Sequence, residues 1–224
     1  MSGDGSAVVF DLDGVLADSS AVMRKAFAIA YAETVGAGEP PFTEYRRHMG
    51  RYFPDIMRLM GLPLAMEGPF VRASAEFAAE IPVYDGVPAM LRRLREHGLR
   101  LAVATGKSGP RARALLDQLG LLTLFDVVTG GDEIARPKPA PDIVVRSLQE
   151  LGVTSARAMM VGDAPADIRS ARAAGVCAVA ATWGTEDEAE LIATGPDVIV
   201  GHPTEVADLA DDLGLTLPVG SANR

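Results

Sequence analysis

The chain has 224 residues, 48% hydrophobic and 23% charged, which is an ordinary composition for a folded globular protein. Its 30 acidic and 21 basic residues give a net charge of -9, which disfavours nucleic acid or an anionic membrane surface as a partner. The single cysteine, Cys177, suits a cytoplasmic location, and no apolar run approaches the ~20 residues of a membrane span.

The first predicted element is a buried strand that runs into two acidic residues. Its apolar run ends at Phe10, Asp11 and Asp13 follow, and Gly14 marks the turn. Both carboxylates are therefore expected at the carboxyl end of a strand, where open α/β sheets bind ligands. Buried carboxylates are costly unless a cation or a reacting group needs them, although turn residues also fit the pattern.

A long block without any strand pattern follows. Apolar residues between Met23 and Ala30 recur at the spacing of one helix face, and the rest of the block reads as short helices separated by prolines. Because this block lies between two strands of the predicted sheet, we expect an inserted helical cap domain. The predicted divisions are a cap at 19–80, a discontinuous core at 1–18 and 81–215, and a flexible tail at 216–224.

Beyond the cap, predicted strands alternate with predicted helices. The strands are expected at residues 101–104, 127–128, 158–161, 176–180 and 198–200. The helices are expected at residues 87–94, 111–119, 141–151 and 168–174, three of them closed directly by a glycine. This alternation predicts an α/β fold with a doubly wound parallel sheet and helices on both faces.

Four groups of chemically active residues stand at the predicted strand ends or in the loops after them. They are Asp11 with Asp13, Thr105 with Gly106, Lys138, and Asp163 with Asp167. Since crossovers in parallel sheets are right-handed, these groups share one edge of the sheet. Carboxylates, a lysine, a hydroxyl and helix-start amides together suit a divalent cation and a phosphoryl group. Taken singly, Thr105 and Asp163 also fit helix caps, and Lys138 fits a solvated loop.

These stretches resemble the motifs of haloacid dehalogenase-like hydrolases, in the branch of phosphoglycolate phosphatases and β-phosphoglucomutases. The matching stretches are residues 11–19, Thr105-Gly106-Lys107, residues 136–142 and residues 162–167. The resemblance implies a Rossmann-like core with an inserted helical cap. It also implies a phosphoric monoester hydrolase that uses Mg²⁺.

The resemblance further assigns roles to residues. It implies that Asp11 is the nucleophile that forms an aspartyl-phosphate, and that Asp13 acts as general acid and then general base, with a raised pKa. The implied Mg²⁺ ligands are the Asp11 carboxylate, the Asp13 backbone carbonyl and Asp163, with Asp167 acting beside them. The implied partners of the phosphoryl oxygens are Thr105, Gly106 and Lys138.

Two alternative functions stay open, a phosphosugar mutase and a catalytically silent binding module. Mutases of this branch carry a phosphate-gripping arginine in the cap, shortly after a glycine. Aligned on Gly50, that place holds Phe53 here, and Arg51 is close but offset. Arg51 is our candidate substrate-binding residue in the cap. Arg46, Arg47 and Arg51 fit either a cleft-facing position or a solvated helix face.

A weaker resemblance covers residues 38–57 of the cap. This stretch is similar to phosphatase-like proteins associated with 3-amino-5-hydroxybenzoate formation in ansamycin-type antibiotic pathways. It implies a sugar- or aminosugar-related phosphate as substrate. We therefore expect a small phosphorylated metabolite as partner, with no nucleic acid and no membrane, and a monomer or weak dimer.

Overall fold

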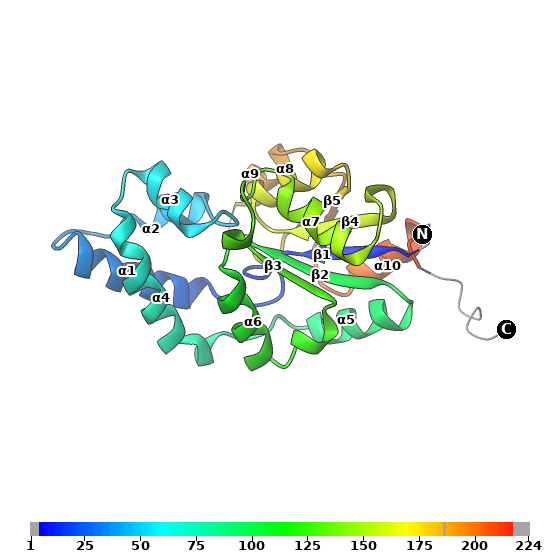
Figure 1. Ribbon diagram of the computed structural model, residues 1–224, viewed down its shortest axis with the longest axis horizontal. Helices are drawn as coiled ribbons and strands as arrows, with labels where there is room; N and C mark the ends of the chain where they lie inside the picture. The colour runs from blue at the N-terminus through cyan, green and yellow to red at the C-terminus, as the bar shows by residue number, and fades with distance from the viewer. Residues whose placement is uncertain (1–4, 186, 217–224) are drawn as a thin grey trace.

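In the computed structural model, which describes residues 5–185 and 187–216, six parallel strands form one sheet in the order β3-β2-β1-β4-β5-β6 (Figure 1). Their bounds are β1 Ala7–Phe10, β2 Arg100–Thr105, β3 Val127–Gly130, β4 Ala158–Gly162, β5 Cys177–Ala181 and β6 Val198–Val200. In the central strand β1, Phe10 lies opposite Val103 of β2 and Val161 of β4. The ends of these three strands therefore lie side by side.

Helices cover both faces of the sheet (Figure 1). Their bounds are α5 Val87–Glu96, α6 Gly109–Gln118, α7 Asp142–Leu151, α8 Pro165–Ala174, α9 Glu188–Ala193 and α10 Glu205–Asp212. Val8 and Phe10 pack with α5, α6 and α10, whereas Ala7 and Val9 pack with α7, α8 and α9. Because alternate strand residues point to opposite faces, covering both faces requires a continuously apolar strand. The predicted doubly wound α/β fold is confirmed.

The remaining helices gather at one end of the molecule, beyond the sheet (Figure 1). They are α1 Ser20–Thr34, α2 Phe42–Arg47, α3 Phe53–Met60 and α4 Glu67–Glu76. They enclose an apolar cluster of their own, in which Phe27 stacks on Tyr45 with ring centroids 4.6 Å apart and Phe53 on Phe70 at 4.2 Å. The exact boundaries of the two domains stay a prediction. Short 3₁₀ turns occupy Leu64–Met66, Ala78–Glu80, Leu122–Leu124, Gly131–Glu133 and Ser155–Arg157.

Several predicted boundaries differ from the structure. The fifth strand begins at Cys177 and not at Val176, because the Val176 amide still bonds to the Ala171 carbonyl at 3.2 Å. That bond closes α8 around Gly175, whose φ of +72° places it in the left-handed region. The third strand extends through Gly130, two residues beyond its predicted end.

The C-terminal region contains order that the sequence analysis did not predict. The short helices α9 and α10 were not foreseen, because their few apolar positions make a weak periodic signal. Leu215, beyond the point where the periodic pattern stops, is buried against the core. Most of the predicted tail, residues 217–224, lies outside the described residues. Within the described part of the chain, no helix has the length and apolar character needed to cross a membrane.

Candidate active site

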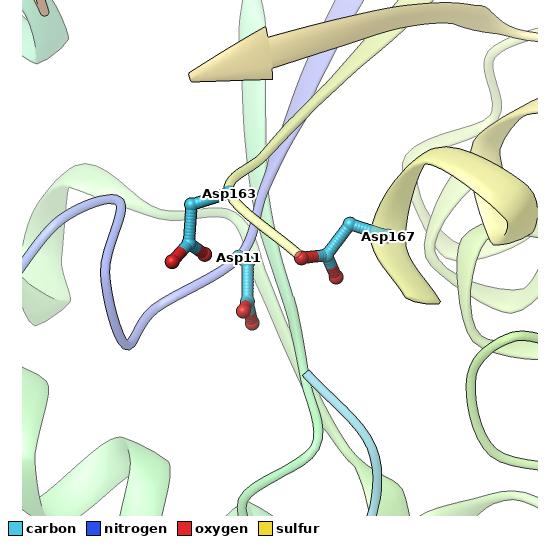
Figure 2. A group of neighbouring side chains, drawn as sticks. All are labelled: Asp11, Asp163 and Asp167. Carbon is cyan, nitrogen blue, oxygen red and sulfur yellow. The ribbon is translucent and has the colours of Figure 1, made fainter. Parts of the chain in front are cut away.

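Three buried aspartates meet at the carboxyl edge of the sheet (Figure 2). Asp11 directly follows β1, Asp163 directly follows β4, and Asp167 lies in the first turn of α8. One carboxylate oxygen from each lies within 4.8 Å of the others. Because β1 and β4 are neighbours in the sheet, Asp11 lies close to two aspartates that follow it by more than 150 positions in the sequence.

Lys138 is the cation that contacts this acidic cluster. Its ammonium donates to Asp167 Oδ1 at 2.6 Å and lies 3.0 Å from Asp11 Oδ1. The second oxygen of Asp167 accepts the Ala164 amide at 3.1 Å, so both of its oxygens have protein donors. The Lys138 side chain is fully buried, which excludes the solvated-loop interpretation. Asp167 therefore positions Lys138 beside Asp11.

The acidic cluster fits a divalent cation. Three carboxylates against one ammonium leave two uncompensated negative charges in a buried place, if all three are ionised. Burial, together with Asp167 and Asp13, raises the pKa of Asp11 to about 7 against the lowering effect of Lys138. Burial and the neighbouring Asp167 and Asp11 likewise raise the pKa of Asp163 well above its usual range. Carboxylate oxygens are the ligands that Mg²⁺ prefers, and its two charges would offset this repulsion.

Gly14 gives the Asp163 carboxylate its space. The φ of Gly14 is +83°, and a Cβ there would lie 2.0 Å from Asp163 Oδ2. Such a distance is impossible, so a side chain at this position must displace the carboxylate. Gly14, in the first motif, therefore leaves room for the Asp163 carboxylate of the last motif.

The Gly14→Ala variant is expected to lower kcat/KM for phosphate ester hydrolysis by about a hundredfold, because small displacements of reacting groups are costly. The matched control is Gly61→Ala, where φ is +65° and a Cβ meets nothing within 4 Å. Both variants carry the strain of a left-handed alanine, about 1–2 kcal/mol. Urea unfolding of the two proteins measures the backbone strain that they share, and steady-state kinetics measures the additional effect of displacing the Asp163 carboxylate in Gly14→Ala. Equal activity of the two variants would contradict the role given to Gly14.

Asp13, two residues after Asp11, forms an ion pair with a lysine. Lys107 Nζ is 3.1 Å from Asp13 Oδ2, and both side chains are largely buried. Burial by itself raises the pKa of Asp13, but Lys107, Ser19 and Arg111 outweigh it, so the net pKa lies below its usual value. The expectation of a raised pKa was therefore wrong for the protein without substrate. The cause is the Lys107 ammonium, which the sequence analysis did not place beside this carboxylate.

Thr105 and Gly106 continue the site from the end of β2. The Thr105 hydroxyl is buried and accepts the Lys107 amide at 3.2 Å. A Cβ at Gly106 would lie 2.3 Å from the Arg51 carbonyl oxygen, so the cap backbone is packed directly on this residue. Gly106 is therefore the point at which the core touches the cap loop.

A cavity of about 50 Å³ opens above these residues. Its core side is formed by Asp11, Asp13, Thr105 and Lys107, and Arg51 contributes from the cap. Burial, followed by repulsion from Arg169, lowers the pKa of the Arg51 guanidinium. The structure therefore brings all the predicted site residues to one region, with Arg51 on the cap side.

The other two cap arginines face a different opening. Arg46 and Arg47 line a cavity of about 130 Å³ that also includes Asp18 and Asp163. Arg47 is exposed and Arg46 is half-buried. Their place on this wall fits a cleft-facing position and their exposure fits a solvated helix face, so both interpretations stay open.

Sequence reasoning missed Lys107, Arg111 and Tyr45 as members of the site. All three line the cavity next to Asp11. Lys107 was part of a quoted motif but received no role. Arg111 carried a usable signal, because a cation in the first turn of a helix opposes the helix dipole and needs another reason to be there.

Comparison with known proteins agrees with this geometry. A family model described as haloacid dehalogenase-like hydrolase matches residues 6–175. The probable phosphatase IndB of Dickeya dadantii is 33% identical over 219 residues, covering 92% of this chain and 94% of that protein. Phosphoglycolate phosphatase of Rhodospirillum rubrum is 34% identical over 231 residues, covering 96% and 93%. A haloacid dehalogenase-like family hydrolase from Streptococcus pneumoniae has a similar structure, with a TM-score of 0.76, 26% identity and coverage of 92% and 98%.

Proposed function

The chain belongs to the haloacid dehalogenase-like hydrolases, and we propose that it is a Mg²⁺-dependent phosphatase of a small phosphorylated metabolite. The observation that carries the proposal is the placement of Asp11, which lies beside the Lys138 ammonium and beside two further buried carboxylates. A carboxylate in this position has a cation to attract phosphoryl oxygens and a place for a metal ion. Similarity to a phosphoglycolate phosphatase and to IndB supports the reaction class.

The proposed reaction has two halves. In the first, an Asp11 oxygen attacks the phosphorus, the bond between phosphorus and the leaving oxygen breaks, and Asp13, which must be protonated in the complex with substrate, supplies the proton that the leaving alkoxide needs. In the second, water attacks the aspartyl-phosphate, Asp13 accepts its proton, and inorganic phosphate is released. Thr105, the Gly106 amide and Lys138 would hold the phosphoryl oxygens throughout.

The Mg²⁺ ion would be held by the Asp11 and Asp163 carboxylates and the Asp13 backbone carbonyl. Bound there, it would reduce the repulsion between anionic carboxylate and anionic phosphate. Asp167 would act from beside the ion, because its two oxygens already accept from Lys138 and from the Ala164 amide. This assignment gives each of the four aspartates a task of its own.

Metal removal tests the proposal. Phosphate release from a panel of sugar, aminosugar and small-acid phosphates is measured with Mg²⁺, with a chelator, and after Mg²⁺ is restored. We expect activity that falls to background with the chelator and returns with the metal, because charge neutralisation is a large part of phosphoryl transfer. Undiminished activity in the chelator would contradict the metal assignment, and a panel without any turnover would contradict the phosphatase.

The panel also addresses the finer substrate class. The cap resemblance to 3-amino-5-hydroxybenzoate-associated proteins favours an aminosugar phosphate and an antibiotic pathway, and both stay predictions. The mutase alternative is less favoured, because Phe53, at the place where those mutases carry a phosphate-gripping arginine, lines the cavity with an uncharged ring that is stacked on Phe70 at 4.2 Å. Stimulation of sugar phosphate interconversion by a trace of bisphosphate would restore that alternative.

A further inference from the structure

Arg111 is a guanidinium in the cavity that has no acidic partner. It lies in the first turn of α6, and its Cζ is 5.6 Å from the centroid of the Phe70 ring. No carboxylate in residues 5–185 or 187–216 forms an ion pair with it. By contrast Arg113, two residues along, pairs with Glu133 at 2.7 Å. A guanidinium stacked on a ring keeps its in-plane N–H donors available for a planar anion.

The acidic groups nearest to Arg111 are already engaged. Asp13 pairs with Lys107 at 3.1 Å. Burial, followed by the charge of Glu67, raises the pKa of Tyr52, and Glu67, which also lines the cavity, forms no ion pair with Arg111 in the part of the chain that the structure describes. Within the described residues, the Arg111 guanidinium therefore forms no direct ion pair on the cavity wall, although the charges of Asp13 and Glu67 act on it from a longer distance.

The Tyr45 hydroxyl is a second polar group without a good partner. Tyr45 is 3% exposed, and its one hydrogen-bond contact is the weak acceptor Sδ of Met23 at 4.0 Å. A buried hydroxyl left in this state is costly, because it has lost its water partners. Tyr45 lines the same cavity as Arg111, Tyr45 from the cap helix α2 and Arg111 from the core helix α6.

The cavity joins these two groups to the reacting carboxylates. Its volume is about 50 Å³, and its lining contains Asp11 and Asp13 together with Arg111 and Tyr45. Arg111 acts electrostatically on Asp13, the residue proposed to protonate the leaving oxygen, which puts Arg111 on the leaving-group side. A second anionic group on the leaving group of a compact substrate would therefore lie within reach of the Arg111 guanidinium.

We propose that Arg111 and the Tyr45 hydroxyl form a subsite for a second anionic group of the substrate, a carboxylate or a second phosphate on the leaving-group side. This inference rests on the proposed phosphatase function and narrows its substrate class. Arg111 binds the anion with two parallel N–H bonds, and Tyr45 donates a third. Arg111 is in this sense the residue that selects anionic over neutral leaving groups.

The test compares two pairs of substrates that differ in the second anion. The first pair is 2-phosphoglycolate and 2-hydroxyethyl phosphate, and the second is glucose 1,6-bisphosphate and glucose 1-phosphate. The wild-type protein is expected to prefer the member of one pair that carries the second anionic group, which identifies that group as carboxylate or phosphate. The Arg111→Met variant is expected to lose about ten- to a hundredfold of that preference in kcat/KM, the usual effect of a charge-assisted hydrogen bond. The kcat/KM values for the substrates without the second anionic group should fall by a much smaller factor, so the ratio of the two values in each pair is the readout.

Two further variants separate selection from structure. Arg111→Lys keeps the charge but not the planar fork, so we expect an intermediate preference. Tyr45→Phe should reduce the preference by a smaller factor. The matched control is Arg24→Gln, which also removes an arginine stacked on a ring, Phe42 at 4.6 Å, but lies outside the cavity. Its substrate preference should equal that of the wild type.

Other outcomes overturn the inference. Equal losses on both members of each pair would show that Arg111 only supports the cap through Phe70. If Arg111→Met keeps the wild-type preference for the substrate with the second anionic group, Arg111 does not belong to the subsite. Calorimetric binding of 2-phosphoglycolate to Asp11→Asn, with and without Arg111→Met, gives a readout that does not depend on turnover. If the wild type hydrolyses no ester, the proposed function fails, whereas weaker binding in the double variant still supports the subsite.

Discussion

Replacing Asp11 with asparagine is expected to lower kcat for phosphate release by about a thousandfold or more, because an amide oxygen cannot replace the attacking carboxylate. The change keeps the shape of the side chain, so substrate binding should be altered much less than turnover. The measurement is steady-state phosphate release with saturating ester and Mg²⁺. Turnover above a tenth of the wild-type rate would contradict the nucleophile assignment.

The same variant is expected to fold normally. Asp11 shares a buried place with Asp163 and Asp167, and removing one of the three charges relieves repulsion while Asp167 still bonds Lys138 at 2.6 Å. In a chelator, the free energy of unfolding of Asp11→Asn should therefore equal or exceed that of the wild type. Asp117→Asn, an exposed position on α6, is the matched control for activity and should remain fully active.

Lys138→Met is expected to lower the free energy of unfolding by about 3–5 kcal/mol in a chelator, because it leaves buried carboxylates without their counter-ion. The lysine side chain is fully buried and lies within 3.0 Å of Asp11 and 2.6 Å of Asp167. Urea unfolding followed by circular dichroism gives the value. Phosphate release should be lost as well, since the ammonium also faces the position proposed for the phosphoryl oxygens.

Two comparisons make the Lys138 prediction specific. Lys25→Met removes a lysine whose ion pair with Glu80 is half exposed, and its cost should stay below about 1 kcal/mol. Added Mg²⁺ should raise the melting temperature of Lys138→Met more than that of the wild type, because a cation replaces part of the missing charge. If Lys138→Met lowers the free energy of unfolding no more than Lys25→Met does, Lys138 does not stabilise the cluster of three aspartates.

The double variant Lys138→Met with Asp167→Asn tests the positioning role of Asp167. Both side chains belong to one buried network, so their separate effects on stability should not add. We expect the double variant to be more stable than Lys138→Met alone, since it leaves one carboxylate fewer without a partner. Additive losses would indicate that Asp167 stabilises the protein mainly through the Ala164 amide.

The sequence by itself determined the sheet and the identity of its functional edge. Apolar runs that end in Asp11, Thr105 and Asp163 are local signals, and parallel topology requires their ends to meet. A buried strand needs apolar residues on both faces, so its position is visible in a single stretch of chain. The family motifs added the expected roles of these residues, which the proposals above carry forward.

Only the tertiary structure decided how the charges of the site are paired. The contact between Lys107 and Asp13 joins residues 94 positions apart in the sequence, and it lowers the pKa of the carboxyl that was expected to be raised. Likewise, the turning of Arg111 toward Phe70 depends on where the cap rests against α6. Side-chain pairing depends on distances of a few ångströms between separately folded segments, and no local pattern in the sequence records those distances.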